Sequence, residues 1–236
     1  MGTLYVVATP IGNLDDISLR AIRTLFTSDV IACEDTRRAG LLLSELQKKV
    51  DTHITQKPRL ISFYDQVESE KIEEVIELLE SGLSVALISD AGTPTISDPG
   101  FKLVRACREK GILVKAVPGP SASVTALSVS GLPTDKFLFL GYPPHKKGHR
   151  SEFWENIKKS AESFKTTVIL YEAPHKLLGT LTEMEQIFGD KEIVILRELT
   201  KIYEEYKKGK ISDIKKYFSA KEPKGEFVLL LSSESL

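Results

Sequence analysis

The first half of the chain alternates short apolar runs with amphipathic helical patterns. Five apolar runs are expected to form buried strands, at residues 4–8, 30–33, 60–62, 85–89 and 113–117. Runs that are apolar throughout are typical of parallel sheets covered on both faces. Between them, apolar positions spaced three and four apart predict helices around residues 14–25, 72–79 and 99–111. This alternation predicts βαβ units and a mostly parallel sheet.

The segment Val117-Pro118-Gly119-Pro120 is the strongest break in the pattern. We therefore expect two α/β domains, at residues 1–117 and 118–236. In the second half, strands are expected at residues 137–140, 167–171, 193–196 and 227–231. Helices are expected at residues 121–130, 153–163, 174–188 and 211–219. Their order is less regular than in the first half and indicates a mixed sheet.

Length and charge narrow the class of protein. A chain of 236 residues is long enough for two modest domains. The net charge of −1 argues against a protein held on nucleic acid by bulk positive charge, although a local basic patch is compatible with it. No apolar run approaches the roughly 20 residues needed to span a bilayer, and no signal peptide is expected at Met1. A cytoplasmic protein is expected.

The two cysteines, Cys33 and Cys107, are far apart and neither stands at metal-ligand spacing. We expect free, partly buried thiols and no metal site. His175 is likewise without a second histidine at ligand spacing, and a lone histidine is more often a capping or surface residue than a catalyst.

Three segments share one design, in which an apolar strand runs into a loop rich in Gly or Pro and then into a helix. They are residues 7–13, 88–94 and 117–122. Any one of them is equally explained as a tight turn, but three on one sheet favour a ligand site at the carboxyl ends of the strands. None matches the G-x-G-x-x-G or Walker A pattern. The sequence therefore disfavours a dinucleotide or ATP enzyme.

Charged residues follow the strand at 30–33, in the order Glu34-Asp35-Thr36-Arg37-Arg38. They would suit substrate binding or proton transfer, yet the residues alone favour an ion-pair network that caps the next helix. Basic residues gather in the loop 142–150 and again at Lys207, Lys208 and Lys210. The loop would suit contacts to an RNA backbone, and the alternative is a solvated surface.

Seven motifs, in order and spacing, resemble one protein family over essentially the whole chain. They lie at residues 9–14, 33–37, 89–94 with 96–100, 118–120 with 130–133, 172–175, 197–201 and 224–226. The chain resembles the ribosomal RNA small subunit methyltransferase I family, within the tetrapyrrole methylase superfamily.

The resemblance implies a bilobal, tetrapyrrole methylase-like fold with a ligand cleft between the domains, and a homodimer. It implies transfer of a methyl group from S-adenosylmethionine to the ribose 2′-oxygen of a cytidine in the decoding region of small-subunit rRNA. The donor-binding positions of the family correspond here to Pro10, Ile11, Gly12, Asp90, Gly92, Thr93, Pro94, Ile96, Ser121, Ala122, Tyr171, Glu172 and Ala173. Contacts to RNA are expected from Lys146, Lys147 and Arg150.

A weakly acidic ribose hydroxyl needs a base within hydrogen-bond reach, and alignment of the reactants supplies much of the remaining rate. The candidate bases are Asp35, Glu34 and Asp65, with Arg37 placing phosphate or stabilising charge. Residues 62–66 stand where the family has a histidine-rich stretch, so that either Asp65 replaces the histidine as proton acceptor or the site depends mainly on positioning.

Three alternatives stay open from the residues. A tetrapyrrole methyltransferase would share the fold and the donor but act on a large anionic macrocycle. A non-catalytic RNA-binding or assembly protein would keep the fold without binding the donor. A different nucleotide-binding α/β enzyme is a weaker third choice, because the phosphate-binding glycine pattern is missing.

Overall fold

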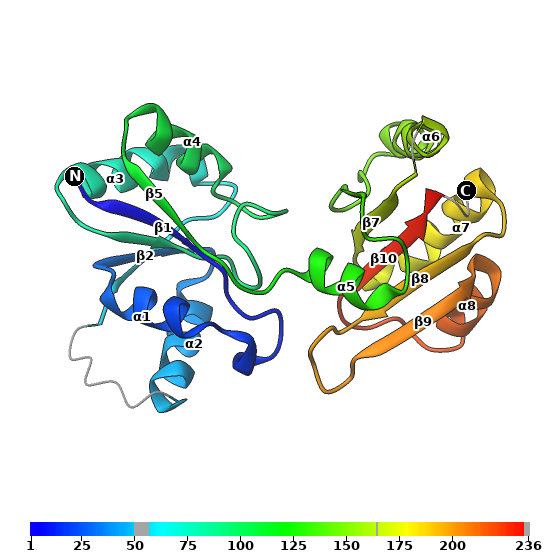
Figure 1. Cartoon of the computed structure of the whole chain (residues 1–236), viewed down its shortest axis with the longest axis horizontal. Coiled ribbons are helices and arrows are strands. Elements are labelled where there is room, and N and C mark those ends of the chain that lie inside the picture. The colour runs from blue at the N-terminus through cyan, green and yellow to red at the C-terminus, as the bar shows by residue number, and fades with distance from the viewer. Residues whose placement is uncertain (50–56, 164, 234–236) are drawn as a thin grey trace. The chain divides into compact units, whose positions relative to one another are not determined.

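The computed structural model describes residues 1–49, 57–163 and 165–233 of the chain, which divides into two compact units (Figure 1). Unit 1 is Met1–Ser121 and unit 2 is Ala122–Leu236. The boundary expected from the sequence, between residues 117 and 118, falls slightly earlier. The ligand cleft expected between the domains stays a prediction, and each unit is described by itself.

Unit 1 contains a parallel sheet. Its strands are β1 (Thr3–Val7), β2 (Val30–Cys33), β3 (Arg59–Ser62), β4 (Val85–Leu87) and β5 (Leu113–Val117). They lie in the order β3-β2-β4-β1-β5, and each neighbouring pair is parallel. The mostly parallel sheet expected from the apolar runs is thereby confirmed.

Helices cover both faces of this sheet. They are η1 (Leu14–Asp16), α1 (Leu19–Thr27), α2 (Thr36–Lys49), α3 (Glu68–Glu80) and α4 (Phe101–Glu109). In Figure 1, α1 and α2 lie on one face and α3 and α4 on the other. Two apolar cores match this arrangement, one containing Leu25 of α1 and Leu46 of α2, the other Leu79 of α3 and Leu103 of α4. The alternating strands and helices therefore form three layers.

Two expectations for unit 1 need correction. Strand β5 is not buried, because it is an edge strand that pairs with β1, and the side chains of Leu113 and Lys115 are exposed. The cysteines are not partly buried but fully buried, with Cys33 and Cys107 each in one of the two cores. Burial raises the pKa of Cys33 to about 12, so its thiol is no nucleophile at neutral pH.

Unit 2 contains a mixed sheet. Its strands are β6 (Phe137–Phe139), β7 (Thr167–Glu172), β8 (Glu192–Arg197), β9 (Glu205–Lys210) and β10 (Phe227–Ser232). They lie in the order β6-β7-β10-β8-β9, with β6 parallel to β7 and the other neighbours antiparallel. The mixed sheet expected from the irregular order is confirmed.

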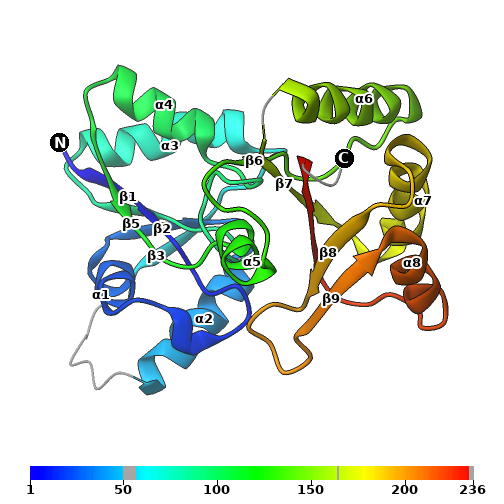
Figure 2. The same ribbon diagram turned by 45° about the vertical axis from the view of Figure 1, so that its right-hand side comes forward.

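The helices of unit 2 are α5 (Ala122–Ser130), α6 (Lys147–Ser163), η2 (Pro174–Lys176), α7 (Leu177–Phe188) and α8 (Ile211–Ser219). Figure 2 shows α7 and α8 on the face of the sheet opposite to α5. Side chains from α6, α7 and α8 form one core with alternate residues of β10, among them Phe227 and Leu229. Among the described residues, no helix is both long and apolar enough to cross a membrane.

Two elements of unit 2 differ from the sequence-based expectation. Strand β9 was not expected, because its residues are mostly charged and form no apolar run; it is a strand because it pairs with β8 along its length. Helix α6 begins at Lys147, so the basic segment expected as a loop over 142–150 is partly helical. Both differences arise from tertiary pairing and packing, which override weak local preferences.

Candidate functional site

At the carboxyl end of the central strand β4 of unit 1, the chain leaves toward a different face of the sheet from the chain that follows β1 or β2. Strand β4 lies between β1 and β2, whose following helices α1 and α2 share one core. The helix that follows β4 is α4, and it packs in the core on the opposite face. Chains that leave adjacent parallel strands toward opposite faces open a crevice where ligands of α/β proteins bind. This edge is therefore the place to look for a site.

The three loops singled out in the sequence meet at this edge. Thr9 N–H donates to Gly92 O at 2.8 Å, and Gly92 N–H donates back to Thr9 O at 3.1 Å. Thr93 Oγ1 donates to Pro120 O at 2.9 Å, which ties the third loop to the second. A Cβ built on Gly119 would lie 3.0 Å from the Cβ of Ala8, so the first and third loops also touch. The three strand-end loops thus form one structure.

Gly92 is required for this junction. Its φ is +88°, in the left-handed region that favours glycine. A Cβ there would lie 3.3 Å from Cγ2 of Ile11, which is tighter than ordinary contact. The other donor positions expected in unit 1 divide by exposure. Pro10, Ile11 and Pro94 are buried, Thr93 and Ser121 are intermediate, and Gly12, Asp90 and Ile96 are exposed. The loops therefore have a buried floor and an exposed rim.

Acidic side chains line the rim beside these loops. Asp90 N–H donates to Glu34 Oε1 at 3.1 Å, and Asp90 Oδ2 pairs with Arg38 at 2.9 Å. These contacts join the end of β2, the start of α2 and the end of β4. Glu34 was a candidate base, whereas Arg38 received no separate role from the sequence. Its pairing with Asp90 depends on a contact between residues far apart in the chain.

Asp98 is the residue that the sequence analysis missed. It is partly buried, and burial raises its pKa to about 7, with Glu34, Asp90 and Asp65 adding to the rise and a hydrogen bond with Ser89 opposing it. It follows the loop after β4 and precedes α4, whose start is held by the bond from Gly100 N–H to the buried Glu68 carboxylate at 2.9 Å. The signal available was a carboxylate inside the 96–100 motif, next to a proline.

Glu34 and Asp65 belong to the same group of carboxylates. Burial raises the pKa of Glu34, and the charges of Asp90 and Asp65 add to that rise, whereas the Asp90 N–H and Arg38 oppose it. Asp65 is exposed and acts on both Glu34 and Asp98 through its charge. We call Glu34, Asp65, Asp90 and Asp98 the carboxylate group. Arg38 is the one cation that directly pairs with it in the described part of the chain.

Asp35 and Arg37 have a different position. Arg37 donates from its backbone N–H to Asp35 Oδ1 at 2.8 Å and from its guanidinium to Asp35 Oδ2 at 2.9 Å. The side-chain hydrogen bond with Arg37 is the main cause that lowers the pKa of Asp35 to about 2. The pair stands at the start of α2, as the alternative interpretation of an ion pair capping the next helix described. An acid of such low pKa is a poor proton acceptor, so Asp35 is a weaker candidate base than expected.

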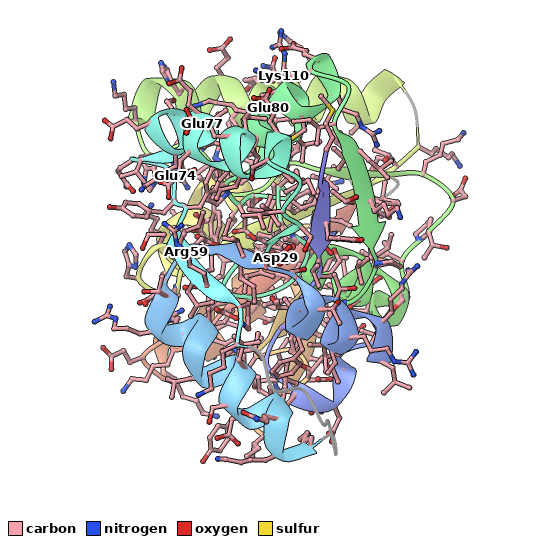
Figure 3. All side chains as sticks on the ribbon, turned by 90° about the vertical axis from the view of Figure 1, so that its left-hand side faces the viewer. Asp29, Arg59, Glu74, Glu77, Glu80 and Lys110 are labelled. Atoms are coloured by element: carbon pink, nitrogen blue, oxygen red, sulfur yellow. The ribbon has the colours of Figure 1, made fainter. Side chains whose placement is uncertain are left out.

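Several charges at the opposite edge of the sheet are paired. Figure 3 shows Asp29, Arg59 and Lys110 on the side of unit 1 that carries the glutamates of α3. There Arg59 pairs with Glu74 at 3.3 Å, and Lys110 pairs with Glu80 at 3.0 Å. Asp29, just before β2, accepts from the backbone and hydroxyl of a serine at 2.7 Å. Since these charges are paired or hydrogen-bonded, the unbalanced carboxylates at the carboxyl edge stand out.

The donor positions expected in unit 2 lie in two neighbouring segments. Tyr171 Oη accepts from Ser123 N–H at 3.1 Å, which places the end of β7 against the start of α5, where Ala122 lies. Glu172 is buried and accepts from Thr180 and from Ala173 N–H. Its carboxylate is therefore occupied within the fold, so any contact to a ligand there would come from the backbone or from Tyr171.

The basic residues expected to contact RNA separate in the structure. Lys146 is exposed, and the side chain of Lys147 lies outside the described residues. Arg150 is buried, and its guanidinium donates to Glu183 at 2.8 Å, to Thr180 Oγ1 at 2.8 Å and to a backbone carbonyl. Arg150 is thus turned into the fold, and we assign it a structural role in place of the expected RNA contact.

Solved structures with this fold are known. The chain superposes on uroporphyrin-III-C-methyltransferase from Thermus thermophilus with a TM-score of 0.64 and 20% identity, covering 98% of this chain and 94% of that one. It superposes on diphthine synthase with a TM-score of 0.71 and 16% identity, covering 98% of this chain and 89% of that one. At these identities the likeness concerns the fold alone. Two α/β domains of the tetrapyrrole methylase type are confirmed.

Sequence relatives are much more similar. The profile of the tetrapyrrole (corrin/porphyrin) methylases matches residues 3–215. The ribosomal RNA small subunit methyltransferase I of Thermotoga maritima is 43% identical, covering 99% of this chain and all of its own length. The proteins of that name from Streptococcus pyogenes and Synechocystis are each 44% identical, covering 98% of this chain and 76% and 79% of their own lengths. The chain belongs to the ribosomal RNA small subunit methyltransferase I family, within the tetrapyrrole methylases.

Proposed function

We propose that this chain transfers a methyl group from S-adenosylmethionine to the 2′-oxygen of a cytidine ribose in the decoding region of small-subunit rRNA. The printed name of its relatives supports small-subunit rRNA as the substrate. The observation that carries the catalytic part is the junction of the three strand-end loops beside the carboxylate group. The cytidine and its 2′-oxygen come from the family resemblance.

The charge of the site suits the proposed donor. When bound, S-adenosylmethionine supplies an electrophilic methyl group on a positively charged sulfonium. Four carboxylates, with Arg38 paired to one of them, leave a negative excess at the rim of the loops. Opposite charge within about 4–6 Å stabilises a bound cation, and the exposed backbone near Gly12 leaves room for a ligand. In unit 1 the donor would be held by residues 10–12, 90–96 and 121, and the resemblance implies Ala122 and Tyr171 as further contacts.

Asp98 is our proposed proton acceptor for the ribose hydroxyl. A base works best when its pKa lies near the working pH, and the pKa of Asp98, raised to about 7 by burial, meets that condition. Glu34 would hold the loop after β4 by accepting from the Asp90 N–H, and Arg38 would fix the carboxylate of Asp90. Asp35 and Arg37 would stabilise the start of α2.

The test is a methylation assay on small ribosomal subunits from cells that lack the corresponding activity. The purified chain is incubated with methyl-labelled S-adenosylmethionine, and the labelled nucleotide is mapped. Label on the 2′-oxygen of one cytidine is the expected result. Label in a tetrapyrrole but never in rRNA would assign the chain to the alternative substrate. Absence of any donor-induced thermal shift would indicate a non-catalytic protein.

The resemblance also implies a homodimer, which we include in the proposal. Light scattering on the purified chain tests it directly: a mass near twice the monomer value is expected, and the value of one chain would exclude the dimer. Of the proposed RNA contacts in the segment 142–150, Lys146 and Lys147 stay in the proposal, and Lys146 is exposed.

A further inference from the structure

The second basic stretch of the sequence, on β9, divides between two faces of the sheet. Burial alternates along the strand, with Tyr206, Lys208 and Lys210 exposed and the residues between them partly covered. Lys208 pairs with Glu192 on the neighbouring strand at 3.1 Å. Lys207 projects to the other face, where α8 packs against β9. Lys207 and Lys208, which are consecutive in the sequence, therefore lie on opposite faces of the sheet.

Lys207 belongs to a cluster built around one tyrosine. Its Nζ lies 4.1 Å from the ring centroid of Tyr217, on α8, and Lys221 Nζ lies 4.8 Å from the same centroid. Lys221 Nζ also donates to Tyr217 Oη at 3.0 Å, and that hydroxyl in turn donates to Glu205. Arg197 Nε donates to the other oxygen of Glu205 at 2.9 Å. We call these five residues the Tyr217 cluster.

Positive charge exceeds negative charge in this cluster. Partial burial works to raise the pKa of Glu205, but hydrogen bonds from Tyr217 and Arg197 outweigh it and hold the pKa below its usual value. The hydrogen bond with Tyr217 raises the pKa of Lys221. Both shifts favour the charged forms of Glu205 and Lys221. Arg197 and Lys207 contact the carboxylate, with Lys207 Nζ at 3.8 Å, and Lys207 and Lys221 lie over the ring of Tyr217.

Such an arrangement favours the binding of an anion. Like charges held close together repel one another, and the attraction of a cation to an aromatic ring offsets only part of that repulsion. The side chains of Arg197 and Lys207 are 24% and 38% exposed, so a ligand can reach them. The hydrogen-bonded frame of Tyr217 and Glu205 fixes the cations in advance, which lowers the entropic cost of binding.

An exposed aromatic residue lies on the same hairpin. Arg197 and Glu205 are the last pair of β8 and β9 before the loop that joins these strands. In that loop Ile202 and Tyr203 are 96% and 73% exposed. Lys201 stabilises the loop by bonds of 2.9 Å to both Glu198 and Glu226. A fixed loop that presents an aromatic ring beside cations is typical of surfaces that bind unpaired RNA, where bases stack and phosphates are neutralised.

We propose that the Tyr217 cluster binds backbone phosphate of the rRNA substrate. The inference rests on the proposed function, because it takes rRNA as the ligand, and it adds a binding site in unit 2 that is separate from the carboxylate group. Lys207 and Lys221 contact the phosphates, Arg197 contributes its charge, and Tyr217 with Glu205 holds the three cations in place. Tyr203 meets an adjacent unpaired base.

The test compares salt dependence of binding in two matched double variants. Lys207→Ala with Lys221→Ala removes two cations of the cluster, and Lys158→Ala with Lys159→Ala removes two exposed cations of α6 in the same unit. The probe is the small ribosomal subunit that the methylation assay uses. For the cluster variant we expect roughly ten- to hundredfold weaker binding at 0.1 M salt and a log–log salt slope shallower by about 1 to 2. The α6 variant should change neither quantity by as much.

The outcomes separate this inference from the proposed function. Donor-induced thermal shift should be the same in wild type and both variants, because the cluster is not part of the donor site. If wild type methylates rRNA and the cluster variant keeps its affinity and salt slope, the inference is wrong and the proposed function stands. Equal losses of affinity in both variants would mean that RNA binding depends on bulk positive charge, and this would also overturn the inference. If millimolar inorganic phosphate stabilises the wild type against thermal unfolding while the cluster variant binds RNA unchanged, the cluster would be assigned to a small free anion instead. A wild type that binds donor but neither binds nor methylates the subunits overturns both.

Discussion

The two units gather charge of opposite sign in the places where charged side chains meet. In unit 1, four carboxylates stand at the carboxyl ends of parallel strands, with Arg38 paired to one of them. In unit 2, Lys207 and Lys221 lie over Tyr217, and Arg197 and Lys207 lie at the single carboxylate of Glu205. The chain as a whole has a net charge of −1, which conceals both excesses.

The difference teaches that net charge is a poor guide to the partners of this protein. The proposed reaction has two substrates of opposite charge, a sulfonium donor and a polyanionic RNA. On the proposed function, a negative excess would favour the first and a positive excess the second.

The largest effect is expected from Asp98→Asn. Loss of a general base costs about 10²–10⁴-fold in kcat, because the amide cannot accept the proton. In wild type, kcat should rise with pH through a limb near pH 7, where Asp98 ionises, and this limb should vanish in the variant. Single-turnover methylation rates across pH 5.5–9 measure both. Asp35→Asn is the matched control, since the pKa of Asp35 is already about 2 and the limb should remain.

The same substitution has a stability consequence of defined sign. The pKa of Asp98 is raised from 3.8 to about 7 in the folded chain, so the folded state holds the proton more tightly than the unfolded state. Ionisation of Asp98 therefore opposes folding as pH rises through this range. Asp98→Asn should raise Tm relative to wild type at pH 8 and have little effect at pH 4. A uniform shift at both pH values would contradict the burial of this carboxylate.

A second substitution tests which basic residues of unit 2 are structural. Arg150→Met removes the guanidinium donor from Glu183 and Thr180, although Trp154 Nε1 still donates to Glu183. Breaking a buried ion pair from one side costs about 3–5 kcal/mol, and we expect a smaller loss here because the side chain of Glu183 is 34% exposed. Denaturant unfolding of the purified chain measures the loss. The salt slope of subunit binding should be unchanged in whatever fraction remains folded. A stable variant with a shallower salt slope of subunit binding would show that Arg150 contacts RNA, as the Tyr217 cluster is proposed to do.

The sequence predicted the fold well where apolar periodicity was strong. The ranges of β2, β5 and α8 were predicted from the residues, and the parallel and mixed character of the two sheets followed from the order of elements. Strand β9 was missed because charged residues dominate it and its pairing with β8 is a long-range interaction. Exposure of β5 depends on its position at the sheet edge, which the order of residues along the chain does not reveal.

The site was predicted in part. Glycine and proline after three strands identified the loops, because those residue types have few other reasons to follow a buried strand. The roles of single carboxylates were not accessible. Asp98 depends on burial and on neighbours from three other segments, and the pairing of Asp35 with Arg37 depends on side-chain geometry at a helix start. The resemblance supplied the substrate, which spacing alone does not contain.

A smaller effect is expected from Gly92→Ala, which acts on the loop junction of unit 1. The new Cβ meets Ile11 at 3.3 Å and the residue keeps a φ of +88°, so strain and crowding should together cost about 1–3 kcal/mol. The affinity for S-adenosylmethionine should fall with it, as measured by calorimetry. Gly82→Ala is the control, because φ there is +97° with nothing within 4 Å of the new Cβ. It should lose comparable stability and keep donor affinity.

The smallest effect is expected from removing a single hydroxyl in each of two tyrosines on unit 2. Tyr217→Phe takes a donor from Glu205 and an acceptor from Lys221, whereas Tyr206→Phe removes only a bond of 3.0 Å to Ser130 O. Each hydrogen bond is worth about 1 kcal/mol, so both variants should lose similar, small amounts of stability. Subunit binding should weaken a few-fold in Tyr217→Phe alone, because Lys221 is no longer held. Equal subunit binding by the two variants would show that the cations of unit 2 act without being positioned by Tyr217. The two charged groups would then differ in how firmly their side chains are held as well as in the sign of their charge.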